Sequence, residues 1–164
     1  MQDILNKILS NEKAAEKSEY LKKQGEKIVL VNGVFDLLHS GHISFLRKAK
    51  SKGDILIVAT NSDASVKKYK GNGRPILSEK HRAIALASLF FVDYVTVFNE
   101  DKALKIIETI KPNILVKGIY YDAGRVDEET ALMNKLGGRV VKINHPIKLS
   151  TSQIIDKIRG VKID

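Results

Sequence analysis

The chain has 164 residues, of which 43% are hydrophobic and none is cysteine. This length allows one domain with a substantial core, and the missing cysteines exclude disulfides and cysteine-based zinc sites. The formal net charge of +9 is compatible with nucleic acid or with a phosphate-rich small molecule, but aromatic residues make up only 6%, which argues against a base-stacking surface.

No apolar run approaches the length that a membrane-spanning helix needs. The N-terminus is charged and does not resemble a signal peptide. We therefore expect a cytoplasmic protein with neither a membrane nor a nucleic acid as partner.

Apolar runs rich in β-branched residues alternate with amphipathic stretches. Residues 3–24 are predicted to form one helix, so that 1–26 is an N-terminal docking segment and 27–164 is a single domain. Strands are predicted at 27–32, 55–60, 94–98, 114–116 and 139–143. Nearly continuous apolar strands that alternate with helices are typical of a parallel sheet covered on both faces. The predicted fold is α/β, a Rossmann-like, doubly wound sheet of five parallel strands with helices on both faces.

In such sheets, ligands bind outside the carboxyl ends of the strands, where the strand order reverses. The loops at these ends are predicted at 33–42, 61–63, 99–100, 117–122 and 144–152. Most of the charged and glycine-bearing segments of the chain fall in these same loops. The fold and the local composition therefore indicate the same side of the sheet.

The segment after the first predicted strand carries the strongest chemical signal. It reads Gly-Val-Phe-Asp-Leu-Leu-His-Ser-Gly-His over 33–42, with a helix expected to begin at Gly41. His39 and His42 then flank a helix N-terminus, whose free N–H groups and dipole favour anions. Glycine there lets a phosphate approach the backbone. Zinc would need further ligands, and His81 and His145 are distant in sequence, so we expect no metal held by the protein.

Further cations follow in the segment 67–75, Lys-Lys-Tyr-Lys-Gly-Asn-Gly-Arg-Pro, and in Lys117-Gly118. We expect the glycines to make the first of these segments mobile and its cations to close over phosphates. Neither a GxxxxGK[ST] loop nor a GxGxxG fingerprint is present, and no cysteine or Ser-His-Asp set offers a nucleophile.

This combination suits nucleotidyl transfer, in which a phosphate oxygen attacks the α-phosphorus of a nucleoside triphosphate and pyrophosphate leaves. The attacking phosphate is already an anion, so the protein has to align the reactants and neutralise charge, without a general base.

The segment 33–42 resembles the first signature of the HxGH nucleotidyltransferase superfamily. Further segments resemble, in order, the adenylyltransferase-domain family of ADP-heptose synthases, at 61–65, 70–75, 92–93, 115–118, 137–138 and 150–155. The resemblance implies transfer of AMP from ATP to D-glycero-β-D-manno-heptose 1-phosphate, a step toward lipopolysaccharide, with Mg²⁺ carried by the nucleotide. It also implies a homodimer.

Other functions remain open at this point. Glycerol-3-phosphate cytidylyltransferase is a more distant resemblance, so CTP and another small phosphate are alternatives to ATP and the heptose phosphate. A non-catalytic protein that binds nucleotide or nucleic acid is the alternative from a different class.

The resemblance also implies residue roles. His39, His42 and Lys70 are expected to be catalytic. The expected nucleotide-binding residues are Asn32, Gly33, Val34, Phe35, Asp36, Gly41, Lys117, Gly118, Ser150, Thr151 and Ser152. The expected substrate-binding residues are Asn61, Asp63, Arg74, Arg82, Tyr120 and Asp122.

The chain departs from the family at one place. Where the family has Lys-Gly-Gly-Asp-Tyr, this chain has Lys-Gly-Ile-Tyr-Tyr over 117–121. Tyr120 replaces the expected aspartate, which leaves the acceptor open, and we expect Asp122 to supply the missing carboxylate.

Overall fold

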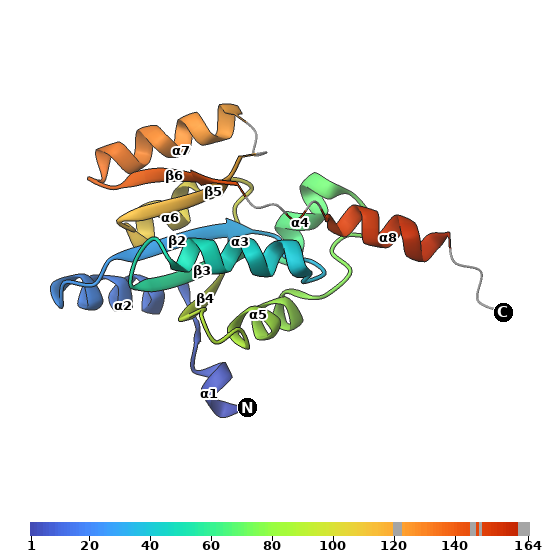
Figure 1. The fold of residues 1–164 in the computed structure, drawn as a ribbon, viewed down its shortest axis with the longest axis horizontal. Helices are drawn as coiled ribbons and strands as arrows, with labels where there is room; N and C mark the ends of the chain where they lie inside the picture. The colour runs from blue at the N-terminus through green and yellow to red at the C-terminus, as the bar shows by residue number, and fades with distance from the viewer. Residues whose placement is uncertain (120–122, 145–146, 148, 161–164) are drawn as a thin grey trace.

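The computed structural model describes residues 1–119, 123–144, 147 and 149–160. These residues form one parallel sheet with helices on both faces (Figure 1). Its six strands lie in the order β1-β4-β3-β2-β5-β6, with bounds β1 Ile8–Leu9, β2 Ile28–Gly33, β3 Ile55–Asn61, β4 Tyr94–Phe98, β5 Ile114–Gly118 and β6 Arg139–Ile143. The helices are α1 Gln2–Leu5, α2 Asn11–Lys23, α3 Ser40–Lys50, α4 Asp63–Lys70, α5 Glu79–Ala87, α6 Leu104–Ile110, α7 Ala123–Lys135 and α8 Thr151–Arg159.

The strand order reverses beside β2. From β2 the chain moves outward through β3 to β4, and it then returns to place β5 on the opposite side of β2. Loops from both halves of the sheet therefore leave the carboxyl ends of β2 and β5 in opposite directions, which opens a crevice between them.

Alternation along the strands builds two cores, one on each face of the sheet. Val29 and Val31 of β2 face a cluster that includes Leu46 of α3 and Leu86 of α5. The intervening strand residues face a second cluster built from α2, α6 and α7, with Ile28, Leu30, Ala14, Ile107 and Met133 among its members. The prediction of a doubly wound α/β sheet is confirmed in its architecture.

The predicted strand count was wrong by one, because residues 3–24 do not form one helix. Ile8 and Leu9 instead pair with Val95 and Thr96, so β1 extends the sheet beyond β4. Ser10 then begins α2, where its side chain accepts a hydrogen bond from the Lys13 N–H. The apolar residues at 4, 5, 8 and 9 suit a helix as well as a short strand, and the exposed edge of β4 decides between them.

The remaining predicted strands are confirmed to within two residues at each end. The glycine-rich loop begins later than predicted, because α4 continues through Lys70 and ends at Gly71, whose φ is +82°. Glycine adopts this left-handed conformation without the steric penalty of a side chain. None of the helices in the described ranges is long and apolar enough to cross a membrane.

The N-terminal segment is joined to the domain by a buried polar contact. Ser18 of α2 is fully buried, and its hydroxyl donates to the carbonyl oxygen of Ile110 at 2.8 Å. That carbonyl lies in the last turn of α6, where intrahelical partners are missing. The contact therefore satisfies a buried helix end as well as docking α2.

We expect Ser18→Ala to lower the free energy of unfolding by about 1–3 kcal/mol, because it leaves a buried carbonyl without its donor. Ser88→Ala is the matched control, since the exposed Ser88 hydroxyl donates to the Ile84 carbonyl at the same 2.8 Å. Its effect should stay within about 0.5 kcal/mol. Urea denaturation measures both, and equal effects would contradict the docking role of Ser18.

Candidate functional site

A pocket of about 350 Å³ lies at the carboxyl ends of β2 and β5, where the strand order reverses. Every residue predicted to be catalytic or nucleotide-binding lines it, and so does Arg74. The lining residues are Asn32, Gly33, Val34, Phe35, Asp36, His39, Gly41, His42, Phe45, Tyr69, Lys70, Arg74, Val116, Lys117, Gly118, Leu149, Ser150, Thr151 and Ser152. The fold thus brings together segments more than 100 residues apart in the chain.

The two histidines at the start of α3 form a stacked pair. Their ring centroids are 3.7 Å apart with 24° between the planes, and the Phe35 ring meets His42 edge-on at 5.2 Å. His39 is the N-cap of α3, with its Nδ1 accepting from the His42 N–H at 3.4 Å. In the neutral imidazole, this places the hydrogen of His39 on Nε2 and makes that atom a donor.

Gly41 allows the His39 ring and the segment that precedes α8 to approach each other closely. A Cβ at Gly41 would lie 3.0 Å from two ring atoms of His39 and 3.2 Å from the Leu149 carbonyl oxygen. A side chain at this position would push the histidine away from the segment that precedes α8. The glycine between the two histidines is therefore required by packing.

The loop that follows β2 takes a strained conformation. Phe35 has a φ of +49°, in the left-handed region that non-glycine residues rarely adopt. Its ring covers Gly33, where a Cβ would lie 3.1 Å from the Phe35 ring. Phe35 is buried, so packing of its ring offsets the backbone strain and turns the chain from β2 toward α3.

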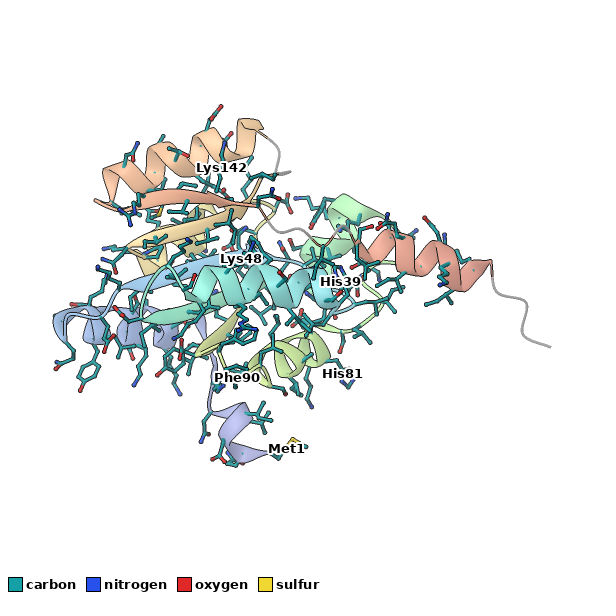
Figure 2. The ribbon with its side chains drawn as sticks, in the orientation of Figure 1. Met1, His39, Lys48, His81, Phe90 and Lys142 are labelled. Carbon is teal, nitrogen blue, oxygen red and sulfur yellow. The ribbon has the colours of Figure 1, made fainter. Side chains whose placement is uncertain are left out.

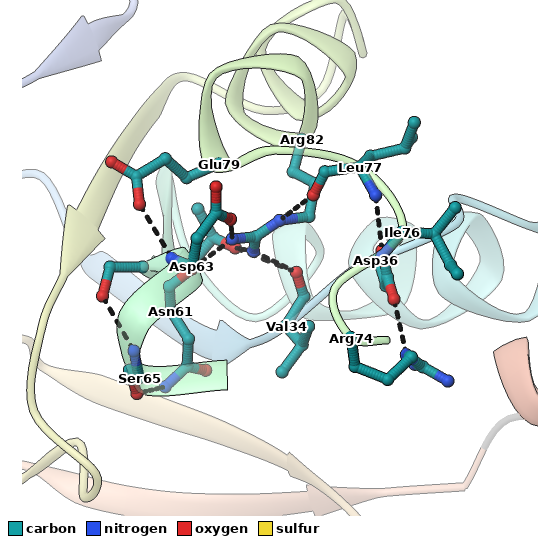
Figure 3. A network of polar contacts seen from close by, with 12 residues as sticks. Val34, Asp36, Asn61, Asp63, Ser65, Arg74, Ile76, Leu77, Glu79 and Arg82 are labelled. Atoms are coloured by element: carbon teal, nitrogen blue, oxygen red, sulfur yellow. Dashed lines mark hydrogen bonds and ion pairs between the residues drawn. The ribbon is translucent and has the colours of Figure 1, made fainter. Parts of the chain in front are cut away.

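Asp36 holds the loop between α4 and α5 against the pocket (Figure 3). Its side chain is 1% exposed, and its Oδ2 lies 2.7 Å from the Arg74 Nε. Its Oδ1 accepts from the backbone N–H groups of Ile76 at 2.7 Å and Leu77 at 3.0 Å. Both carboxylate oxygens are thus engaged by the protein, and Asp36 positions Arg74 at the pocket wall.

Lys70 lies on the same wall, at the end of α4. Partial burial lowers the pKa of its ammonium, and the positive charge of Arg74 lowers it further, while Asp36 acts in the opposite direction. Burial is thus the main cause of the lowered pKa, and the second cation at the same hollow adds to it. An anion bound between them would relieve this effect.

On the opposite wall, Lys117 forms a buried ion pair with Glu129 of α7. The Lys117 Nζ lies 2.7 Å and 2.6 Å from the two Glu129 carboxylate oxygens and donates to the Asn32 Oδ1 at 2.8 Å. The two charged side chains are 1% and 7% exposed. Sequence reasoning missed Glu129, because its place in α7 carries no motif and only the fold brings it to Lys117.

The N-terminus of α8 closes the pocket from the far side. Ser150 caps this helix, accepting from the Gln153 N–H at 3.2 Å while the Gln153 side chain accepts from the Ser150 N–H at 2.8 Å. These two hydrogen bonds form a capping box, which satisfies two backbone N–H groups at the start of α8. The helix ends of α3 and α8 therefore both face the pocket, and each adds the positive end of its dipole.

The structure places Arg82, a predicted substrate-binding residue, away from the pocket lining. The Arg82 side chain is fully buried and does not line the pocket. All five of its N–H donors have protein acceptors (Figure 3), at distances of 2.6–3.0 Å, namely Leu77 O, Val34 O, Thr60 Oγ1, Asn61 O and Asp63 Oδ1. Arg82 therefore joins the loops that follow β2 and β3 to the start of α5.

Two more predicted substrate-binding residues lie outside the pocket lining, and two others fall outside the described residues. Asp63 does not line the pocket and is the ion-pair partner of Arg82. Asn61 lines a smaller neighbouring hollow. Tyr120 and Asp122 lie outside the residues that the structure describes.

We expect Arg82→Met to lower the free energy of unfolding by about 3–5 kcal/mol, because it leaves several buried acceptors and the half-buried Asp63 carboxylate without their donors. Arg82→Lys should recover only part of this, since an ammonium has three donors for five acceptors. The exposed Arg47 is the control, and Arg47→Met should change stability by about 0.5 kcal/mol or less. A stable Arg82→Met protein in urea denaturation would contradict the assignment.

Comparison with known proteins identifies the family to which this site belongs. A cytidylyltransferase-like family model matches residues 30–157, which contain all the described pocket segments. The chain belongs to the cytidylyltransferase-like family. The resemblance to the nucleotidyltransferase superfamily is thereby confirmed.

Curated relatives narrow this resemblance. The chain is 50% identical over 164 residues to the bifunctional protein HldE of Helicobacter pylori (strain HPAG1), covering 96% of this chain and 32% of that protein. It is 49% identical over 138 residues to bifunctional HldE of Geobacter metallireducens, covering 84% of this chain and 28% of that protein. The predicted resemblance to the ADP-heptose synthase family is confirmed. The chain spans about a third of the length of these relatives.

Solved structures agree with the fold. A lipopolysaccharide core biosynthesis protein from Thermoplasma volcanium matches with a TM-score of 0.62 and 31% identity, covering 73% of this chain and 96% of that one. Pantoate-beta-alanine ligase from Francisella tularensis has the same TM-score at 18% identity, covering 94% of this chain and 78% of that one. The second likeness is one of fold alone.

Proposed function

We propose that this chain transfers AMP from ATP to D-glycero-β-D-manno-heptose 1-phosphate and releases pyrophosphate. The observation that carries the proposal is the single pocket that joins the histidine pair, Lys70 and the first turn of α8. The similarity to the HldE proteins supports it. ADP-heptose would be the product, and the acceptor phosphate oxygen would form the new bond to the α-phosphorus as the bond to pyrophosphate breaks.

The pocket residues supply what this reaction needs. His39 and His42, as N–H donors at the N-terminus of α3, would stabilise negative charge on the α-phosphate in the transition state. Lys70 and Arg74, which line the same pocket, would bind the phosphates. The capped N-terminus of α8, with Thr151 and Ser152, would hold the outer phosphates through backbone N–H groups and hydroxyls.

Mg²⁺ would arrive on the triphosphate. Asp36 is the one carboxylate among the described residues that line the pocket, and both its oxygens are engaged by Arg74 and by the loop. The described residues contain no group of three or more His, Cys, Asp and Glu arranged to hold a metal. These residues suit an ion carried by the phosphates rather than one held by carboxylates of the protein.

A cytidylyltransferase that acts on a small phosphate is the second candidate, favoured by the family that matches. Pyrophosphate release distinguishes the two when ATP and CTP are each tested against heptose 1-phosphate and glycerol 3-phosphate. Activity with ATP and the heptose phosphate supports the first candidate. Nucleotide binding without pyrophosphate release from any pair would contradict both.

Several expectations stay as predictions. They are the homodimer, the cytoplasmic location, the absence of a nucleic acid or membrane partner, and the acceptor contacts of Tyr120 and Asp122. Tyr120 lies in the segment 117–121, where this chain departs from the family, and Asp122 follows it directly.

The histidine pair gives a direct test. His39→Asn keeps an oxygen that can cap α3. We expect His39→Asn and His42→Asn each to lower kcat about 10²–10³-fold, because the shorter amide side chain does not place an N–H donor where the imidazole places it. His81→Asn is the matched control, because His81 lies exposed on α5, away from His39 (Figure 2). Turnover measured by pyrophosphate release should be unchanged in that control. Full turnover in both pocket variants would overturn the proposal.

Lys70 gives a pH test of the phosphate site. Burial and Arg74 lower its pKa in the free protein, and a bound triphosphate would raise it again, so binding takes up a proton. Affinity for ATP should therefore fall as pH rises through the pKa of the free protein. The guanidinium of the Lys70→Arg variant stays protonated, so the affinity of this variant for ATP should fall less over the same pH range than that of the wild type. Calorimetric titrations from about pH 7 to about pH 10 measure this, and identical pH profiles would contradict it.

A further inference from the structure

A second, smaller hollow adjoins the pocket on the β4 side of β2. Its volume is about 20 Å³, and it shares Asn32 and Tyr69 with the pocket. Asn61 of β3 and Glu129 of α7 also line it. This volume accommodates about one water molecule or one hydroxyl group, so the hollow is too small for a nucleotide base or a whole sugar.

The orientation of the Asn61 amide is determined by its neighbours. The Ser65 hydroxyl donates its hydrogen to the Glu100 carbonyl at 3.1 Å, so the Ser65 oxygen can only accept from Asn61, at 3.1 Å. The amide nitrogen of Asn61 therefore faces Ser65 (Figure 3). Asn61 is 6% exposed, and its carbonyl oxygen is left as a hydrogen-bond acceptor on the side away from Ser65.

The Asn32 amide is oriented by the same kind of argument. The Lys117 ammonium has donors only, so the Asn32 atom at 2.8 Å from it must be the carbonyl oxygen. The ion pair with Glu129 holds that ammonium in place. The amide nitrogen of Asn32, with its two hydrogens, is thus left as the donor of this side chain.

We propose that Asn32 and Asn61 read one hydroxyl group of the acceptor in this hollow. A hydroxyl both donates and accepts, and the two amides offer one acceptor and one donor whose orientations the protein has already set. The ligand is a polyhydroxylated phosphate whose phosphate lies in the larger pocket, while one hydroxyl reaches past Asn32. This proposal rests on the nucleotidyl transfer proposed above.

The test compares acceptors as well as variants. Pyrophosphate release is measured with ATP, a sugar 1-phosphate and a set of its monodeoxy analogues, each lacking one hydroxyl. Wild-type protein should use one of these analogues with a kcat/KM about tenfold lower than the parent sugar phosphate. In the Asn61→Ala variant, the kcat/KM for the parent sugar phosphate should fall to the value that the wild-type protein has with that analogue. The KM for ATP should stay unchanged.

Two further variants make the result specific. Asn32→Asp keeps the oxygen that faces Lys117 but loses the N–H donor. This variant should also use the parent sugar phosphate no better than the monodeoxy analogue. Asn99→Ala is the matched control, because Asn99 is exposed and lines neither cavity. Its preference among the acceptors should equal that of the wild type.

The outcomes separate the two proposals. If wild-type protein releases pyrophosphate but Asn61→Ala and Asn32→Asp lose activity equally with every acceptor, the asparagines have only a structural role and the hydroxyl site is overturned. If wild-type protein binds ATP but releases no pyrophosphate with any acceptor, the proposed function fails, and the hydroxyl site with it.

Discussion

Two buried carboxylates hold the cations of this protein's pocket in place. Asp36 fixes Arg74 on one wall, and Glu129 fixes Lys117 on the other. A pocket that gathers positive charge for a phosphate ligand has to keep those charges oriented when no ligand is bound. A buried ion pair adds little stability because desolvation offsets the attraction, but it fixes where each cation lies. The geometry of the site therefore depends on these two carboxylates.

Lys70 differs from these two cations. Its pKa is lowered by burial and by Arg74, with Asp36 only partly compensating. An anion that binds beside Lys70 would stabilise its charged form and raise its pKa, because the anion supplies the negative charge that is missing from its surroundings. The pocket thus combines two cations held by the fold with one that the ligand itself stabilises.

A buried charge also fixes the position of the backbone around the site. Arg82 uses every donor of its guanidinium to hold three carbonyl groups, a hydroxyl and a carboxylate, which come from the loop after β2, the end of β3, the start of α4 and the segment before α5. Since Asn61 is among these acceptors, through its backbone carbonyl, the end of β3 that lines the smaller hollow is joined to the loop that carries Phe35. A charged residue far from the ligand can in this way set the spacing between two parts of the site.

The sequence by itself determined five of the six described strands, most of the helices and most of the pocket lining. These depend on local patterns, namely apolar alternation, helix caps and glycines next to histidines, and the carboxyl ends of parallel strands must meet at one edge. Only the tertiary structure decided that Ile8 and Leu9 form a strand, because β4 offers them an edge. It also decided that Arg82 is buried rather than facing a ligand and that Glu129 partners Lys117. The physical reason is that a charged side chain is stable in the interior only when it has a partner there. Partners more than ten residues away produce no periodic pattern in the sequence, so only the folded chain reveals them.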